Sequence, residues 1–138
     1  MIKIIHVDDE KNYLDLTKEI LAVYDKEINI ESFTSPRKVI ENVLTNEPDL
    51  VLSDYSMPEM NGIELIRQLR KYSNVPVILY SGSEKENIAE KAFEAGVEDY
   101  IRKSFDTMHY LLLLKRIKNA VDSYRARRTL ETAVMAQV

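Results

Sequence analysis

The sequence predicts an α/β fold, a doubly wound five-stranded parallel sheet flanked by five helices. Short apolar runs rich in β-branched residues alternate five times with stretches of helical periodicity. Strands that alternate with helices in this way form βαβ units, whose right-handed crossovers place helices on both faces of the sheet. A length of 138 residues, with 45% hydrophobic and 30% charged residues, is typical of one globular domain with its own core.

The first half of the chain supplies three of the predicted strands and two of the helices. Residues 2 to 7 form a compact β-branched run, which is typical of a buried strand. Apolar residues at helical spacing then predict a helix over residues 13 to 24. Ser35 and Pro36 begin the second helix, with a capping hydroxyl followed by proline in the first turn, and Pro48 ends it. The other two strands span residues 28 to 33, where alternation indicates a more exposed strand, and residues 50 to 52.

The second half opens with a loop over residues 55 to 62 that contains Pro58 and Gly62. Gly96 suits the left-handed C-terminal cap of the fourth helix. A long final helix begins at about Met108. Between these landmarks, the apolar pattern predicts helices over residues 63 to 69 and 88 to 93, and strands over residues 75 to 80 and 99 to 103.

Polar side chains follow four of the predicted strands, at the points where these strands end. They are Asp8 and Asp9 after the first strand, Asp54 after the third, Ser81 after the fourth and Lys103 at the end of the fifth. Because the crevice of a doubly wound sheet lies outside the carboxyl ends of its strands, we expect these side chains to converge. Carboxylates held close together repel, which raises the pKa of a member unless a cation binds. Oxygen ligands, without Cys or a suitably spaced His pair, favour Mg²⁺.

The same residues resemble the receiver domain of response regulators, the phosphoacceptor family of two-component signalling, over roughly residues 2 to 120. The resemblance is carried by Asp8-Asp9, a loop from Asp54 through Pro58 to Gly62, Ser81-Gly82, and Tyr100 three residues before Lys103. The Asp pair alone is a weak signal, but the ordered set, each member after its own strand, is specific. The resemblance implies a flavodoxin-like sheet with the strand order 2-1-3-4-5.

The resemblance also implies a role for each of these residues. Asp54 is then the phosphoacceptor, which attacks the phosphohistidine of a sensor histidine kinase or of a histidine phosphotransfer protein. Ser81 and Lys103 would contact the phosphoryl oxygens. Mg²⁺ would be held by Asp9, Asp54 and the backbone carbonyl of Ser56, with Asp8 reaching the ion through water.

Tyr100 occupies the position of the family's switch aromatic. In the family this aromatic rotates inward on phosphorylation and remodels the face formed by helix four, strand five and helix five. The resemblance thus implies a phosphoswitch that assists its own phosphotransfer and dephosphorylation, and not a turnover enzyme. Its partners would be the kinase and a downstream protein target or fused output domain, and a homodimer is left open. Plain core packing is the alternative interpretation of Tyr100.

Two features depart from the family pattern or vary within it. Family members usually carry proline after the lysine, in a cis peptide that aims the lysine at the site, but here Ser104 follows Lys103. A cis bond before a non-proline residue costs about 2.5–4 kcal/mol, so a trans and a strained cis link are both open. Ser56 and Ser83 occupy variable positions beside the site and are small and uncharged. Our hypothesis is that neither positions the hydrolytic water strongly.

Two other functions compete with the phosphoswitch. A Mg²⁺-dependent phosphohydrolase of the haloacid type would place an Asp-x-Asp triplet after the first strand, and no such triplet follows residue 7. A pseudo-receiver scaffold, which binds partners without phosphorylation, would be marked by loss of Asp54, of another acid or of Lys103, and all are present. The sequence therefore favours the phosphoswitch.

Other residues that could carry chemistry have a structural interpretation. His6 is expected to pack within the first strand, because no second histidine is spaced to share a metal. His109, at the start of the final helix, is expected to be solvated. Gly62 and Gly82 read as turn glycines, since neither belongs to a phosphate-binding glycine-rich loop.

The charge of the chain is unevenly distributed. The formal net charge is −4, yet residues 115 to 128 hold six Lys or Arg and one Asp. The rest of the chain is acidic, which argues against nucleic-acid binding, because nucleic-acid binding needs a basic surface. The basic stretch is interpreted as a solvated helix face or as a contact for an acidic partner. We expect no membrane contact and a cytoplasmic location, because no apolar run could span a bilayer, no Cys is present, and no secretory cleavage region follows the N-terminus.

The final helix is longer than that of a typical receiver. We expect the receiver domain to span residues 1 to 120 and residues 121 to 138 to extend the last helix. Arg128 and Glu131 break the apolar spacing that precedes them. The extension is either a signalling or dimerising linker to an output domain, or a frayed end with leftover expression sequence.

Overall fold

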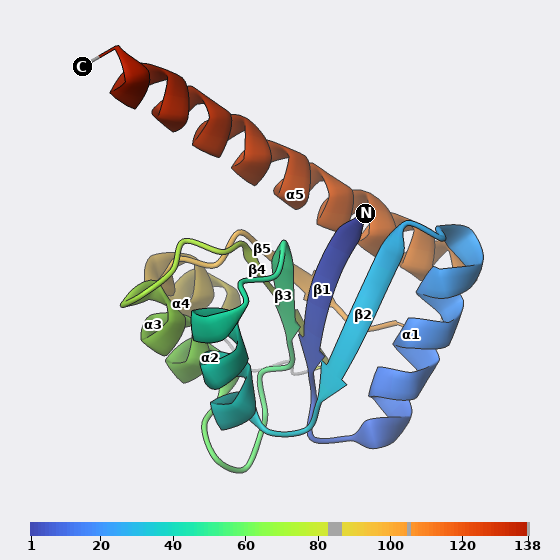
Figure 1. The fold of residues 1–138 in the computed structure, drawn as a ribbon. Coiled ribbons are helices and arrows are strands. Elements are labelled where there is room, and N and C mark those ends of the chain that lie inside the picture. The colour runs from blue at the N-terminus through green and yellow to red at the C-terminus, as the bar shows by residue number, and fades with distance from the viewer. Residues whose placement is uncertain (83–86, 105, 138) are drawn as a thin grey trace.

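A computed structural model describes residues 1–82, 87–104 and 106–137. Within these ranges, five parallel strands form one sheet in the order β2-β1-β3-β4-β5 (Figure 1), which confirms the predicted fold class and strand order. The bounds of the strands are β1 Ile2–Val7, β2 Ile28–Phe33, β3 Leu50–Ser53, β4 Val77–Ser81 and β5 Asp99–Arg102. Strand β4 begins two residues later than the sequence predicts, and β3 extends one residue further, to Ser53.

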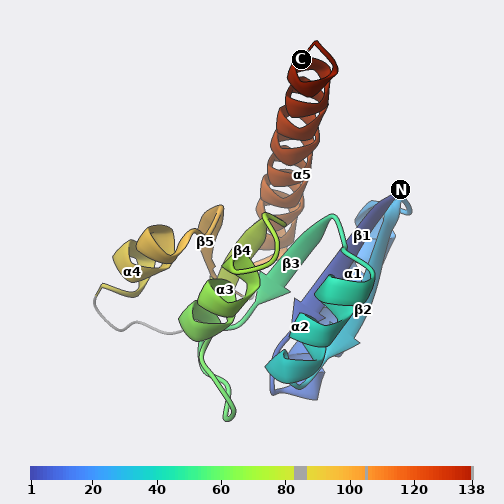
Figure 2. The same cartoon turned by 60° about the vertical axis from the view of Figure 1, so that its left-hand side comes forward.

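Helices cover both faces of the sheet, as Figure 2 shows. Their bounds are α1 Lys11–Tyr24, α2 Pro36–Thr45, α3 Gly62–Arg70, α4 Ile88–Ala95 and α5 Thr107–Ala136. Helices α1 and α5 pack on one face, and α2, α3 and α4 pack on the other. This arrangement explains why β1, β3 and β4 are nearly continuous apolar runs, whereas the edge strand β2 alternates buried and exposed residues.

Each face of the sheet carries its own apolar cluster. On the α1/α5 face, side chains such as Leu52 and Ile117 are fully buried, and on the other face Leu79 and Ile66 are fully buried. Burial of one such side chain contributes roughly 1.5–3 kcal/mol relative to exposure. The two clusters therefore pack against both faces of the sheet, and this packing fixes the positions of its strand ends.

The helix starts differ in how they are capped. At α3, the Asn61 side chain accepts a hydrogen bond of 2.9 Å from the Glu64 N–H, and the Asn61 N–H donates to the Glu64 carboxylate. Pro36 stands in the first turn of α2 as predicted, but the predicted capping by Ser35 is wrong. Ser35 occupies the N-cap position, but its side chain makes no capping bond to the described residues. The fixed φ of Pro36 suits a helix start. Gly96 ends α4 in the left-handed conformation, as predicted, with a φ of 100°.

The long helix α5 has a buried half and an exposed half. Its buried residues run as far as Val121, which has no exposed surface and lies in the α1/α5 cluster. Residues 125 to 137 are exposed, and this part of α5 projects beyond the sheet (Figure 1). Its basic side chains pair with acids near the amino ends of the strands, in Arg125–Asp49, Arg127–Glu98 and Arg128–Glu47 at 3.1, 3.5 and 3.6 Å.

His109 departs from the expectation that it is solvated. It is only 8% exposed, and its ring stacks on that of Tyr80 from β4. The helix start that carries His109 lies over the sheet, so the imidazole faces the strand and not the solvent. His6 packs within β1 as predicted and has no exposed surface. Among the described residues, no helix combines the length and the apolar character that a membrane crossing needs.

Candidate functional site

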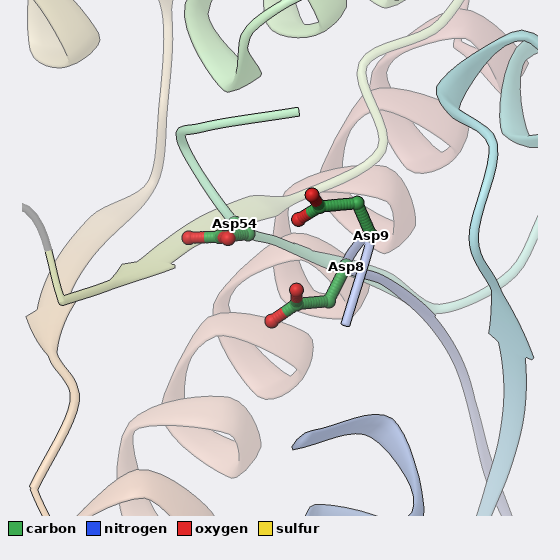
Figure 3. Close-up of side chains that lie close together, drawn as sticks. All are labelled: Asp8, Asp9 and Asp54. Atoms are coloured by element: carbon green, nitrogen blue, oxygen red, sulfur yellow. The ribbon is translucent and has the colours of Figure 1, made fainter. Parts of the chain in front are cut away.

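Three aspartates meet at the carboxyl end of the sheet. Asp8 and Asp9 follow β1, and Asp54 follows β3, which is paired with β1 in parallel. Each contributes a carboxylate oxygen to a group whose members all lie within 4.8 Å of one another (Figure 3). Asp8 is fully buried and Asp54 is 9% exposed, whereas Asp9 faces solvent. The convergence predicted from the strand ends is thus present for the acids.

Backbone hydrogen bonds hold the acidic group in place. The Asp54 N–H donates to the Val7 carbonyl at 3.0 Å, which joins the end of β3 to the end of β1. The Glu10 N–H donates to Asp8 Oδ1 at 2.9 Å, and the Tyr55 N–H donates to Asp54 Oδ1 at 2.8 Å. Two of the three carboxylates are therefore oriented by the main chain immediately after them.

Lys103 brings a positive charge to this group. Its ammonium lies 2.7 Å from Asp8 Oδ2 and 3.6 Å from Asp54 Oδ1, and its side chain is only 12% exposed. The Lys103 N–H donates to the Ser81 carbonyl at 3.0 Å, which continues the pairing of β5 with β4. The peptide bond between Lys103 and Ser104 is trans. Lys103 thus reaches two of the acids without a cis link after it, which resolves the alternative that the sequence left open.

The electrostatics of Asp54 follow from its surroundings. Burial, followed by the negative charge of Asp8, raises the pKa of Asp54 above its ordinary value. The positive charge of Lys103 and hydrogen bonds from the Tyr55 N–H and the Ser81 side chain act in the opposite direction. One ammonium among three carboxylates leaves an excess of negative charge in a half-buried place. Oxygen donors at this spacing fit a hard divalent cation such as Mg²⁺.

The other predicted site residues lie around the aspartates. Ser81 is buried at the end of β4, and Ser56 is exposed in a shallow depression that Asp9 and Asn61 also line. Tyr100 is partly buried and packs against the apolar cluster on the α2, α3 and α4 face, and burial raises its pKa. The functional roles of these residues stay predictions, and Ser83 lies outside the described residues.

Sequence reasoning missed one contributor to the site, Tyr13, and the close packing of another, Gly62. The ring of Tyr13 on α1 lies 4.3 Å from the Lys103 ammonium, measured to the ring centroid. In the sequence, Tyr13 fits the apolar stripe of a helix, and its spacing does not indicate a contact with Lys103, 90 residues away. Gly62 read as a turn glycine, but a Cβ there would lie 2.5 Å from the Asp54 carbonyl oxygen. Both contacts depend on how the helices seat on the sheet, which local sequence does not specify.

Comparison with known proteins identifies the family. Residues 4–115 match the family model described as the response regulator receiver domain. The chain is 31% identical over 123 residues to the sensory transduction protein LytT of Bacillus anthracis, covering 89% of this chain and 50% of that protein. It is 30% identical over 128 residues to the response regulator ArlR of Staphylococcus saprophyticus, covering 88% and 57%. The chain thus spans about half the length of these curated relatives.

Solved structures agree on the fold. A CheY-like response regulator receiver domain protein from Methanospirillum hungatei superposes with a TM-score of 0.80 at 24% identity, over 92% of this chain and 98% of that one. The beryllofluoride-activated NtrC4 receiver domain dimer gives a TM-score of 0.78 at 23% identity, over 90% and 99%. At such identities these likenesses support the fold alone. Since the family model covers most of the chain, the protein belongs to the response regulator receiver domain family of two-component signalling.

Proposed function

We propose that the chain is a phosphoswitch in which Asp54 accepts a phosphoryl group from a sensor histidine kinase or a histidine phosphotransfer protein. The observation that carries the proposal is the joint approach of one ammonium and three carboxylates, with Lys103 at 2.7 Å from Asp8 and 3.6 Å from Asp54. A half-buried group of this kind can orient a carboxylate nucleophile and neutralise phosphoryl charge.

The proposed transfer uses few protein groups. An Asp54 carboxylate oxygen attacks phosphorus, the bond from phosphorus to the imidazole nitrogen of the donor breaks, and the electron pair returns to that nitrogen. The ammonium of Lys103 and the hydroxyl of Ser81 would hold the phosphoryl oxygens. Mg²⁺ would be held by Asp9, Asp54 and the Ser56 carbonyl, with Asp8 one water away. When bound, it would neutralise the charge that develops on the phosphoryl oxygens.

The proposed response is a population shift on the face formed by α4, β5 and α5. A phosphoryl group can favour only a state that it contacts better. Ser81, at the end of β4, and Lys103, directly after β5, are the groups that would contact it. Tyr100 on β5 would report this change as the switch aromatic. Tyr100 is partly buried against the apolar cluster on the α2, α3 and α4 face, so its rotation would change the packing there.

The proposal also covers the location of the switch in the cell and its downstream target. We propose that it acts in the cytoplasm, on an output domain fused to it or on a separate protein target. The match covers only 57% and 50% of the two curated relatives, which supports a fused output in proteins of this kind. We also propose that the chain forms a homodimer through the face formed by α4, β5 and α5. Sedimentation with and without beryllofluoride would measure the formation of this dimer.

The test of phosphoacceptance is covalent. Incubation with Mg²⁺ and acetyl phosphate should add about 80 Da, the mass of one phosphoryl group on a carboxylate, as measured by intact-protein mass spectrometry. Asp54→Asn should abolish the adduct, and Asp15→Asn on the exposed face of α1 is the matched control that should keep it. No adduct on the unmodified chain would favour a pseudo-receiver scaffold, and rapid multiple turnover would favour a phosphohydrolase.

The metal component has a separate test. A ligand that binds only the folded state stabilises it by RT ln(1 + [L]/Kd), so Mg²⁺ should raise the thermal midpoint in a concentration-dependent way. Asp9→Asn removes a solvent-facing ligand oxygen and should weaken this dependence, while Asp15→Asn should leave it unchanged. An equal response to Mg²⁺ in both variants would contradict the proposed ligand set.

A further inference from the structure

We infer that Tyr13 is a positioning residue for Lys103, whose ammonium it holds against the acidic group with the face of its ring. Ser104 follows Lys103 in a trans link, and the contacts of the Lys103 side chain itself direct its ammonium. The catalytic consequence rests on the proposed function, but the contact itself does not.

The Lys103 ammonium is held from several sides. It lies 4.3 Å from the centroid of the Tyr13 ring and 5.8 Å from that of Tyr80. The acids Asp8 and Asp54 lie at 2.7 and 3.6 Å from the same nitrogen. A cation within about 6 Å of a ring centroid, over the ring face, is attracted by the negative face of the π-system. Tyr13 is the nearer of the two rings and has the larger share of this attraction.

Tyr13 is well placed to act from a fixed position. It lies in the first turn of α1, where its N–H donates to the Glu10 carbonyl at 3.1 Å. Glu10 directly follows the aspartate pair and is itself tied to Asp8 by a hydrogen bond of 2.9 Å. The ring is therefore attached to the same short segment as Asp8 and Asp9, so the Tyr13 ring and these two acids keep their relative positions around the Lys103 ammonium.

The contact of Tyr13 with Lys103 is separate from the two apolar clusters of the sheet. Among the described residues, neither cluster includes Tyr13, and the same holds for its buried neighbour Leu14. The Tyr13 side chain is partly buried at the edge of the sheet, beside the charged group. A leucine there would keep apolar cover for the helix, but it would offer no π face to the ammonium.

The magnitude of the effect follows from two opposing quantities. A free lysine side chain has many rotamers, and their entropy works against a single aimed conformation. A cation–π contact contributes about 0.5–2 kcal/mol, increasing as the ammonium is desolvated. Lys103 is 12% exposed, which places it toward the desolvated end of that range. Loss of the ring should therefore lower the productive population of Lys103 by about 2- to 30-fold.

The contact can be tested without phosphorylation. In the unmodified chain, NMR should show a nuclear Overhauser effect between the Lys103 ε-methylene protons and the Tyr13 ring protons, and an upfield ring-current shift of that methylene. Tyr13→Phe keeps the ring and should keep the shift, and Tyr13→Leu should remove it. Absence of the Overhauser effect in the unmodified chain, or an unchanged methylene shift in Tyr13→Leu, overturns the inference.

The functional consequence is measured by the rate of Asp54 phosphorylation with Mg²⁺ and acetyl phosphate. Tyr13→Leu should slow the reaction by about 2- to 30-fold with little change in Mg²⁺ affinity, and Tyr13→Phe should restore the rate. Tyr24→Leu, at the far end of α1, is the matched control and should leave the rate unchanged. Equal rates in the Leu and Phe variants at position 13 overturn the positioning role. If the unmodified chain forms no adduct, the proposed function fails, while the NMR result still decides the contact.

Discussion

Tyr80 on β4 and His109 on α5 share a buried hydrogen bond of 2.8 Å between the tyrosine Oη and the histidine Nε2. Their rings are stacked, with centroids 5.5 Å apart and planes inclined by 12°. Burial lowers the pKa of His109, so the imidazole favours its neutral form, which can pair with the hydroxyl. The bond ties the first turn of α5 to the strand residue immediately before Ser81.

Removal of the Tyr80 hydroxyl should destabilise the domain. In Tyr80→Phe the His109 Nε2 keeps its buried position but loses this partner, which costs about 1–3 kcal/mol. Urea unfolding measures the loss, and Tyr72→Phe on the exposed surface is the control. A double-mutant cycle with His109→Leu should give a coupling energy of about 0.5–1.5 kcal/mol. A loss in Tyr80→Phe no larger than in the control would show that the bond contributes nothing.

The fold and the convergence of the aspartates could be predicted from the sequence, because both depend on local sequence pattern. Alternating strand and helix periodicity determines the parallel sheet, and a parallel sheet brings Asp8 and Asp54 to one edge whatever the details of packing. The environment of His109 is different in kind. Its partner, Tyr80, lies 29 residues away, and only the seating of α5 on the sheet brings the two rings together. The same holds for the ring of Tyr13 over Lys103.

Gly62 should not tolerate a side chain. A Cβ at this position would lie 2.5 Å from the backbone oxygen of Asp54 and 2.5 Å from Leu79 Cδ1. The backbone oxygen cannot move without moving the acidic group, so Gly62→Ala should cost about 1–3 kcal/mol in unfolding free energy. It should also displace the Asp54 amide resonance in NMR spectra.

Gly82 provides the matched control for that substitution. A Cβ there would meet no atom of the described residues within 4 Å, so Gly82→Ala should leave the unfolding free energy nearly unchanged. Equal stability of the two alanine variants in urea would contradict the close packing of Gly62 under Asp54.

His6 should make the domain less stable as the pH falls. It is fully buried, both ring nitrogens lack a hydrogen-bond partner among the described residues, and burial lowers its pKa from 6.5 to about 4. Asp8 acts in the opposite direction, and Lys103 reinforces the effect. Between these two values the unfolded chain binds a proton at His6 and the folded chain does not. Stability is therefore lost as the pH falls through this window, by up to about 1.4 kcal/mol per pH unit.

His6→Leu isolates this contribution from that of the carboxylates. The variant removes two desolvated nitrogens, so its unfolding free energy at about pH 7.5 should equal or exceed that of the unmodified chain. Its loss of stability between about pH 7 and pH 5 should be smaller, because no buried imidazole is left to protonate. Parallel pH profiles from urea unfolding would exclude His6 as the source.

The end of the folded body can be located by truncation within α5. A chain that ends at residue 120 loses Val121, which is fully buried, and the hydrogen bond from Tyr124 to Glu47 at 3.1 Å. We expect this chain to lose about 2–4 kcal/mol, mostly through the lost apolar burial. A chain that ends at residue 124 keeps both contacts and loses only exposed residues. With them go the surface ion pairs of Arg125, Arg127 and Arg128 and the exposed hydrogen bond from Arg125 to the Met1 carbonyl.

Each such surface pair contributes at most about 1 kcal/mol, and salt screens it. The chain that ends at residue 124 should therefore be nearly as stable as the full chain, and the small difference should shrink further in high salt. Urea unfolding of the three chains at low and high ionic strength measures both effects. Equal losses for the two truncations would mean that the exposed half of α5 is part of the cooperative unit, whereas the expected result places the boundary after Tyr124.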